Sequence, residues 1–232
     1  METTYRDSYR TPVAALGDDA RAAFLTRTYT HLLGAILAFA GIEVFLFSSG
    51  LAYPIANAML SVSWLLVLGA FVIAGTIASR AAATATTKAG QYGALFAYVL
   101  VEALIFVPLL AIAFQSVPGA IGKAAWVTVF AFSALTAVAF FTGKDFSFLG
   151  GFIKWAGILA IVAIVCGVLF GFDLGLWFSV AMVGLAGASI LWTTSRILRE
   201  YPEDRYVSAS LELFASVALM FWYVLSIFMS RD

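Results

Sequence analysis

Seven long apolar runs constrain this chain more than any other feature. Each run holds about 20 mostly apolar residues, which is the length needed to cross the hydrocarbon core of a bilayer. One water-soluble core of this size cannot bury so much apolar surface, so the bilayer must act as solvent for most of it. We therefore expect an all-α integral membrane protein with seven transmembrane helices, at roughly residues 28–47, 59–78, 92–114, 124–142, 148–170, 174–198 and 208–229.

Charge and cysteine content exclude several other classes of protein. Charged residues make up 11% of the chain, against about 25% in soluble domains. Thirteen basic and thirteen acidic residues cancel, so no basic excess indicates a nucleic-acid partner. Cys166 is the one cysteine and His31 the one histidine, which argues against a disulfide framework and against a metal site. We expect no cofactor and no bound metal, and the lipid bilayer is the expected partner.

The polar N-terminus forms a separate region. Residues 1–27 are mixed in charge and precede the first apolar run, so we predict a tail there and a membrane domain over residues 28–232. Residues 13–26 suit either a short surface helix or a disordered segment. No cleavable signal peptide is visible, because the first apolar run starts too late and is too long for one.

The distribution of Lys and Arg predicts the orientation in the membrane. With seven spans, one side holds the N-terminus and the even-numbered connections, and these carry eleven of the thirteen basic residues. The opposite side has Lys123 and Arg231. Because positive residues favour the cytoplasmic side, we expect a cytoplasmic N-terminus and a C-terminus across the membrane.

Three acidic residues lie inside apolar runs and are candidates for an ion path. An ionised acid at the bilayer centre costs roughly 2.5–3.5 kcal/mol, so such residues are functional candidates by default. Glu102 lies near the middle of the third run and suits either proton or ion passage or a hydrogen bond between helices. Glu43 and Glu212 lie about a turn from the ends of their runs, where an interfacial role is favoured: snorkelling for Glu43, and pairing with Arg196 or Arg205 for Glu212.

Local patterns suggest further contacts. Thr193, Thr194 and Ser195 are either ligands in a polar cavity or hydroxyls bonded to their own helix. Asp145 or Ser147 is expected to cap the fifth helix. Small residues one turn apart are expected where helices pack closely, at Gly167 and Gly171, Ala70 and Ala74, and Gly184 and Ala188.

Several stretches resemble the Bax inhibitor-1 (transmembrane Bax inhibitor motif) family, from about residue 20 to the end. The resemblance is carried by Lys144-Asp145-Phe146-Ser147-Phe148-Leu149-Gly150-Gly151, Ser189-Ile190-Leu191-Trp192-Thr193-Thr194-Ser195-Arg196-Ile197 and Ser210-Leu211-Glu212-Leu213-Phe214, with Phe24-Leu25-Thr26-Arg27-Thr28-Tyr29. Its bacterial branch, the modulators of the membrane protease FtsH, is the most similar. The resemblance implies a seven-helix bundle with a central helix enclosed by the others, in a bacterial inner membrane.

The same resemblance locates a departure from the family. Members that leak calcium or protons resemble one another in a pair of aspartates, whose places fall here on Thr193 and Ser216. Without two acids there is no proton-sharing pair and no oxygen-rich calcium site. We expect a packed scaffold with a small hydroxyl-lined pocket between Thr193 and Ser216.

The sequence leaves two candidate functions, a protease regulator and a leak channel, and it disfavours a third, an enzyme. The resemblance implies a regulator that binds the FtsH protease and slows degradation of membrane substrates. The alternative is a proton or cation (calcium) leak channel of the Bax inhibitor-1 type, weakened by the loss of both aspartates. An enzyme is not expected, because the chain has no nucleophile with a base and no metal set.

Overall fold

Seven long helices make up most of the molecule. A computed structural model describes residues 11–230. The long helices are α2 (Asp18–Ser48), α4 (Trp64–Thr84), α5 (Lys88–Ser116), α6 (Ala120–Thr142), α7 (Leu149–Phe170), α8 (Gly175–Arg199) and α9 (Tyr206–Met229). Each is long and apolar enough to cross a membrane, which confirms the all-α, seven-span prediction. The shorter elements are η2 (Val13–Ala15), α3 (Ala52–Leu60) and η3 (Glu203–Arg205).

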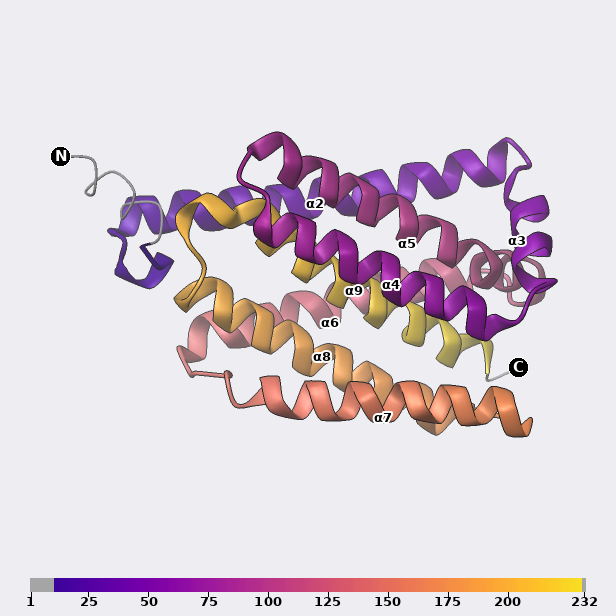
Figure 1. Cartoon of the computed structure of the whole chain (residues 1–232). Helices are drawn as coiled ribbons and strands as arrows, with labels where there is room; N and C mark the ends of the chain where they lie inside the picture. The colour runs from indigo at the N-terminus through magenta and orange to yellow at the C-terminus, as the bar shows by residue number, and fades with distance from the viewer. Residues whose placement is uncertain (1–10, 231–232) are drawn as a thin grey trace.

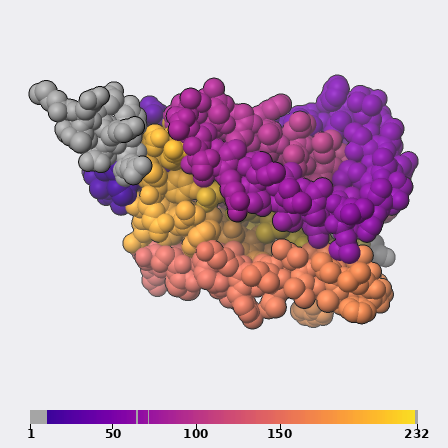
Figure 2. All heavy atoms as spheres, in the orientation of Figure 1, coloured from indigo at the N-terminus to yellow at the C-terminus, as the bar shows by residue number. Residues whose placement is uncertain are grey.

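The helix α9 lies at the centre of the bundle. It contacts α2, α4, α5, α6 and α8, and Figure 1 shows it running between α5 above and α8 below. Leu213 and Leu225 on α9 are fully buried. By contrast, α7 packs on the outside, chiefly against α8, and forms the lower edge of the face in Figure 2. The implied central helix is therefore the last span.

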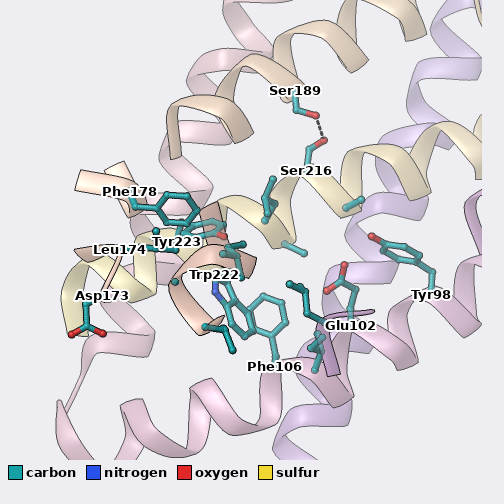
Figure 3. A pocket seen from close by; sticks show the side chains of 18 of the residues that line it. Tyr98, Glu102, Phe106, Asp173, Leu174, Phe178, Ser189, Ser216, Trp222 and Tyr223 are labelled. Carbon is teal, nitrogen blue, oxygen red and sulfur yellow. Dashed lines mark hydrogen bonds between the residues drawn. The ribbon is translucent and has the colours of Figure 1, made fainter. Parts of the chain in front are cut away.

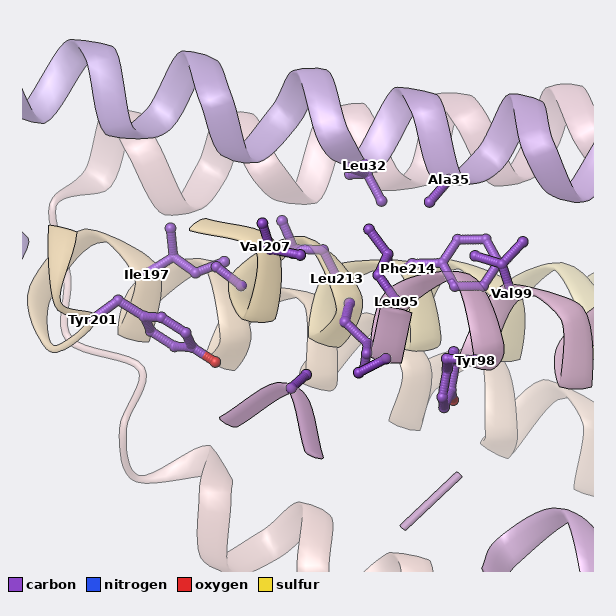
Figure 4. Packing of buried hydrophobic residues seen from close by; sticks show 14 of the residues in the cluster. Leu32, Ala35, Leu95, Tyr98, Val99, Ile197, Tyr201, Val207, Leu213 and Phe214 are labelled. Carbon is purple, nitrogen blue, oxygen red and sulfur yellow. The ribbon is translucent and has the colours of Figure 1, made fainter. Parts of the chain in front are cut away.

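Two hydrophobic cores surround α9, one toward each end of the bundle. Figure 4 shows the first, where Leu32 and Ala35 of α2, Leu95 and Val99 of α5, and Phe214 of α9 meet. The second contains Phe106 of α5, Ile190 of α8 and Leu225 of α9. Elsewhere large apolar side chains are exposed on the outer helix faces, including Phe141 at 89%. This distribution is typical of helices that face lipid.

The helix boundaries differ from the prediction mainly in the first third of the chain. The first helix begins at Asp18 rather than near residue 28, and Phe24 and Thr28 are buried in the bundle. Residues 18–27 are thus part of a helix, while residues 1–10 of the predicted tail lie outside the described residues. Between the first two predicted spans the chain forms α3, so the second span begins later than predicted, at Trp64, and ends at Thr84.

Two of the three expected small-residue pairs, the ones that contain glycine, do not mark the closest helix contacts. Gly171 ends α7 with φ +71, and a Cβ on Gly167 would meet the Phe172 carbonyl oxygen at 3.1 Å, so this pair serves the α7–α8 turn. A Cβ on Gly184 would meet nothing within 4 Å. Close approach occurs at Gly150, where a Cβ would lie 2.7 Å from Trp192 Nε1.

Candidate functional site

A cavity of about 630 Å³ opens between the helices of the bundle. Its walls come from α4, α5, α7, α8, α9 and the α7–α8 turn, and they are mostly apolar. Its polar groups are few, and Figure 3 shows Tyr98 beside Glu102 and Ser189 beside Ser216. The polar lining residues are Tyr98, Glu102, Asp173, Ser189, Ser216, Trp222 and Tyr223.

Glu102 provides the carboxyl group at one end of this cavity. It lies in the middle of α5 and is only 3% exposed. The Tyr98 hydroxyl, one helical turn earlier, is its polar neighbour, and the two groups face each other in Figure 3. Asp173, in the α7–α8 turn, is the other acid among the lining residues and lies at the far end of the view. The sequence prediction of a buried acid in the third span is confirmed.

Ser189 and Ser216 form a hydroxyl pair between α8 and α9. Their Oγ atoms are 2.9 Å apart, and the Ser216 hydroxyl also lies 3.1 Å from the carbonyl oxygen of Glu212. Because Ser216 has one hydroxyl proton, donating it to that carbonyl leaves Ser189 as the donor between the two serines. The pair lines the cavity and is drawn with a dashed line in Figure 3.

Of the two hydroxyl residues predicted to line a pocket, Ser216 lines the cavity and Thr193 does not. Thr193 is 2% exposed and is not among the residues that line the cavity. Ser189, four residues earlier on the same face of α8, takes its place. The neighbouring hydroxyls of Thr194 and Ser195 also lie away from the cavity, and the Ser195 hydroxyl accepts a hydrogen bond from the Phe146 N–H at 3.2 Å.

Glu43 is buried outside this cavity, so the expectation that it reaches the interface is wrong. It is 7% exposed, and neither carboxyl oxygen has a hydrogen-bond partner within residues 11–230. The reason is α3, a helix that the sequence analysis did not predict. Residues beside Glu43 on α2, Ile42 and Leu46, pack in one apolar cluster with α3 and α5.

Glu212 belongs to a charged network at the α8–α9 connection. Arg196 donates to Glu212 at 3.1 Å and to Glu200 at 3.2 Å, which confirms the predicted pairing of Glu212 with Arg196. The guanidinium also lies 4.6 Å from the centre of the Trp192 ring. Burial, followed by the nearby charge of Glu212, raises the pKa of the Tyr201 hydroxyl well above its usual range. Glu212 is thus held in an ion pair rather than in the cavity.

The α6–α7 connection is fastened to the end of α8. Arg199 donates to the Gly143 carbonyl oxygen at 2.6 Å and lies 4.0 Å from the Asp145 carboxylate. Asp145 accepts from the Ser147 N–H at 2.9 Å, and this hydrogen bond holds the pKa of its carboxyl below the usual range. This turn precedes α7, so Asp145 orders the loop and does not cap the helix as predicted.

Comparison with known proteins gives one family and two relatives. Residues 21–232 match the sequence model of a family described as "Inhibitor of apoptosis-promoting Bax1". The chain is also similar to two uncharacterized proteins of Neisseria meningitidis, one from serogroup A and one from serogroup B. Each is 30% identical over 128 residues, which is 54% of this chain and 56% of the relative. The match therefore spans little more than half the length of these curated relatives.

Proposed function

This multi-pass membrane protein belongs to the Bax inhibitor-1 family, and from that premise we propose that it lets protons pass slowly across the membrane by way of Glu102. The observation that carries the proposal is that Glu102, buried in the middle of α5, lines a 630 Å³ cavity that also contains Ser216. Acids inside membrane spans characteristically mark ion or proton pathways. The carboxyl group here comes from α5, whereas positions 193 and 216 carry hydroxyls.

Protons suit this site better than calcium. Calcium takes six to eight oxygen ligands, usually with several carboxylates. The Glu102 end of the cavity offers one carboxyl group and the Tyr98 hydroxyl, while the Ser189–Ser216 pair is already hydrogen-bonded. A single carboxyl group is sufficient to accept and release a proton. No step of this proposal requires an enzyme or a cofactor.

Proton flux into liposomes tests the role of Glu102. We expect liposomes with wild-type protein to dissipate an imposed pH gradient faster than empty liposomes. Glu102→Gln should lose most of that difference, because a side-chain amide does not accept and release a proton near neutral pH as a carboxyl group does. Glu43→Gln is the matched control, since it removes a second buried acid that lies outside the cavity. Equal flux through wild type and Glu102→Gln, or an equal loss in Glu43→Gln, would contradict the proposal.

Modulation of the FtsH protease is a second candidate function. The observation in its favour is the placement of the first described residues: the Val13 N–H donates to the Tyr201 carbonyl oxygen at 2.9 Å. Val13 therefore lies beside the α8–α9 connection, at the end of the bundle that carries most of the basic residues. If that end is cytoplasmic, as the charge distribution predicts, an ATP-driven protease would have access to the N-terminus.

A short deletion at the N-terminus tests this second function. Removing residues 2–10 keeps the Val13 contact, whereas a longer deletion would remove it. We expect the deletion to weaken co-purification with the protease and to shorten the half-lives of its membrane substrates. A glycine-serine segment of equal length in place of residues 2–10 separates a sequence requirement from a length requirement. Unchanged capture and unchanged half-lives in both variants would remove the support for this function.

A further inference from the structure

A cluster of cations and aromatic rings lies where α2, α5 and α9 meet near the α8–α9 connection. The Tyr206 ring, at the start of α9, has Lys88 Nζ 3.9 Å and Arg27 Cζ 5.7 Å from its centre. His31 Nε2 lies 2.9 Å from the Tyr92 hydroxyl, which is 3.4 Å from the Tyr206 hydroxyl. Three helices thus hold two positive charges beside one ring. We call these five residues the interfacial cluster.

The two cations of the interfacial cluster have no carboxylate partner within residues 11–230. No acid in that range forms an ion pair with Arg27 or Lys88. Lys88 donates to the Asp204 carbonyl oxygen, which leaves two of its three N–H groups available. The Asp204 carboxylate pairs with Arg205 at 3.5 Å. Two like charges held near one ring repel each other, and an anion between them would relieve that repulsion.

The surface beneath the cluster is apolar and open. Gly34, Ala38 and Gly41 follow His31 at helical spacing along α2, and a Cβ on either glycine would meet nothing within 4 Å. Phe96, one turn after Tyr92 on α5, is 61% exposed. Because these residues lie inside transmembrane helices, the exposed strip faces lipid tails. A phospholipid matches this arrangement, since its phosphate would lie at the two cations and its acyl chain along the apolar strip.

We propose that the interfacial cluster binds the phosphate of an anionic phospholipid, with an acyl chain along the small-residue face of α2. Arg27 and Lys88 contact the phosphodiester, and the rings of His31, Tyr92 and Tyr206 fix the positions of the two cations. Basic sites between transmembrane helices on the cytoplasmic side characteristically bind anionic headgroups. The same phosphate chemistry occurs in free phosphate, but the apolar strip selects the lipid.

Native mass spectrometry of detergent-purified full-length protein tests this site. Dioleoyl-phosphatidylglycerol, dioleoyl-phosphatidylcholine and inorganic phosphate are titrated separately. We expect the wild type to bind the anionic lipid most tightly, and Arg27→Gln/Lys88→Gln to lose about 25-fold in apparent affinity, since each basic residue near an anionic surface contributes a factor of about five. Arg27→Lys/Lys88→Arg should retain binding. Lys144→Gln/Lys154→Gln removes two exposed charges elsewhere and should match the wild type.

Each alternative result overturns the proposal. Wild-type affinity in the Arg27→Gln/Lys88→Gln variant would show that anionic lipid binds elsewhere. Equal affinity for the two lipids would show that the negative charge is not recognised. Full competition by inorganic phosphate would show that the site takes free phosphate rather than lipid. Because Lys88 also donates to the Asp204 carbonyl oxygen, Arg27→Lys/Lys88→Arg and the melting temperature of each lipid-free variant separate loss of lipid binding from loss of the fold.

Discussion

Tyr201 shows how one side chain of the α8–α9 connection depends on its neighbours. It is 7% exposed, packs in the same hydrophobic core as Ile197 and Val207, and lies beside the Arg196 guanidinium, 5.4 Å from its ring centre. Glu212 lies close enough to oppose ionisation of the hydroxyl. The folded protein therefore favours the neutral phenol, and this preference makes stability depend on pH.

Replacing Tyr201 with Phe should make the protein less sensitive to alkaline pH. A phenol whose folded pKa exceeds its unfolded value of about 10 stabilises the fold fully below that value, and this stabilisation is lost as the pH rises through the folded pKa. The melting temperature of the wild type should therefore fall more than that of Tyr201→Phe between about pH 7 and about pH 11. Tyr53→Phe, at a more exposed tyrosine, is the control. Parallel pH profiles for wild type and Tyr201→Phe would refute the argument.

Individual site residues were predictable where a charge stood in an apolar run. Glu102 stands out because a long apolar run flanks it on each side, and Glu212 because it lies a turn into the last run with Arg196 and Arg205 as possible partners. Ser189 has no such signal, since serine is common in membrane helices and only the α8–α9 packing selects it. Its spacing of four from Thr193 was the one available clue.

At the scale of the elements, contact between α7 and α8 depends on Gly150. Its position leaves room for the Trp192 indole, whose ring also lies beside the Arg196 guanidinium. The indole cannot move away without losing that contact. Two of the segments that carried the family resemblance, residues 144–151 and 189–197, therefore pack directly on each other.

Substituting Gly150 with Ala should destabilise the protein by about 1–3 kcal/mol, the usual cost of overpacking. The new Cβ would lie 2.7 Å from Trp192 Nε1 and would force the ring to shift. The neighbouring Gly151→Ala is a matched control, because its Cβ would meet nothing within 4 Å. Thermal unfolding in detergent measures both variants. Equal melting temperatures for the two would show that the indole moves without cost.

Most elements were predictable because a membrane span needs a long apolar run. For five of the seven spans, both predicted ends lie within about four residues of the ends of the observed helix. The first third failed for a physical reason: α3 is short and apolar, so it could not be separated by hydropathy from the span that follows it. Residues 13–26 had suited a short surface helix or a disordered segment; from Asp18 on they instead begin α2, because Phe24 and Thr28 pack against the bundle.

For the whole molecule, seven spans place the start of α2 and the end of α9 at opposite ends of the bundle (Figure 1). The basic residues then predict which end faces the cytoplasm. Single cysteines at two positions test this in a Cys166→Ser background, with a membrane-impermeant maleimide on intact cells. Lys123→Cys should be labelled from outside, and Lys144→Cys only after the membrane is opened. The reverse pattern would invert the orientation.

The hydroxyl pair of Ser189 and Ser216 has an electrical consequence. Moving one elementary charge through a membrane potential of 100 mV involves about 2.3 kcal/mol of work. Two neutral hydroxyls carry no net charge, so the energy of the contact that joins α8 to α9 beside the cavity does not change with the membrane potential in this way. Any voltage dependence of the described residues must then arise from the ionisation of the buried acids Glu102 and Glu43 or from charges at the ends of the helices.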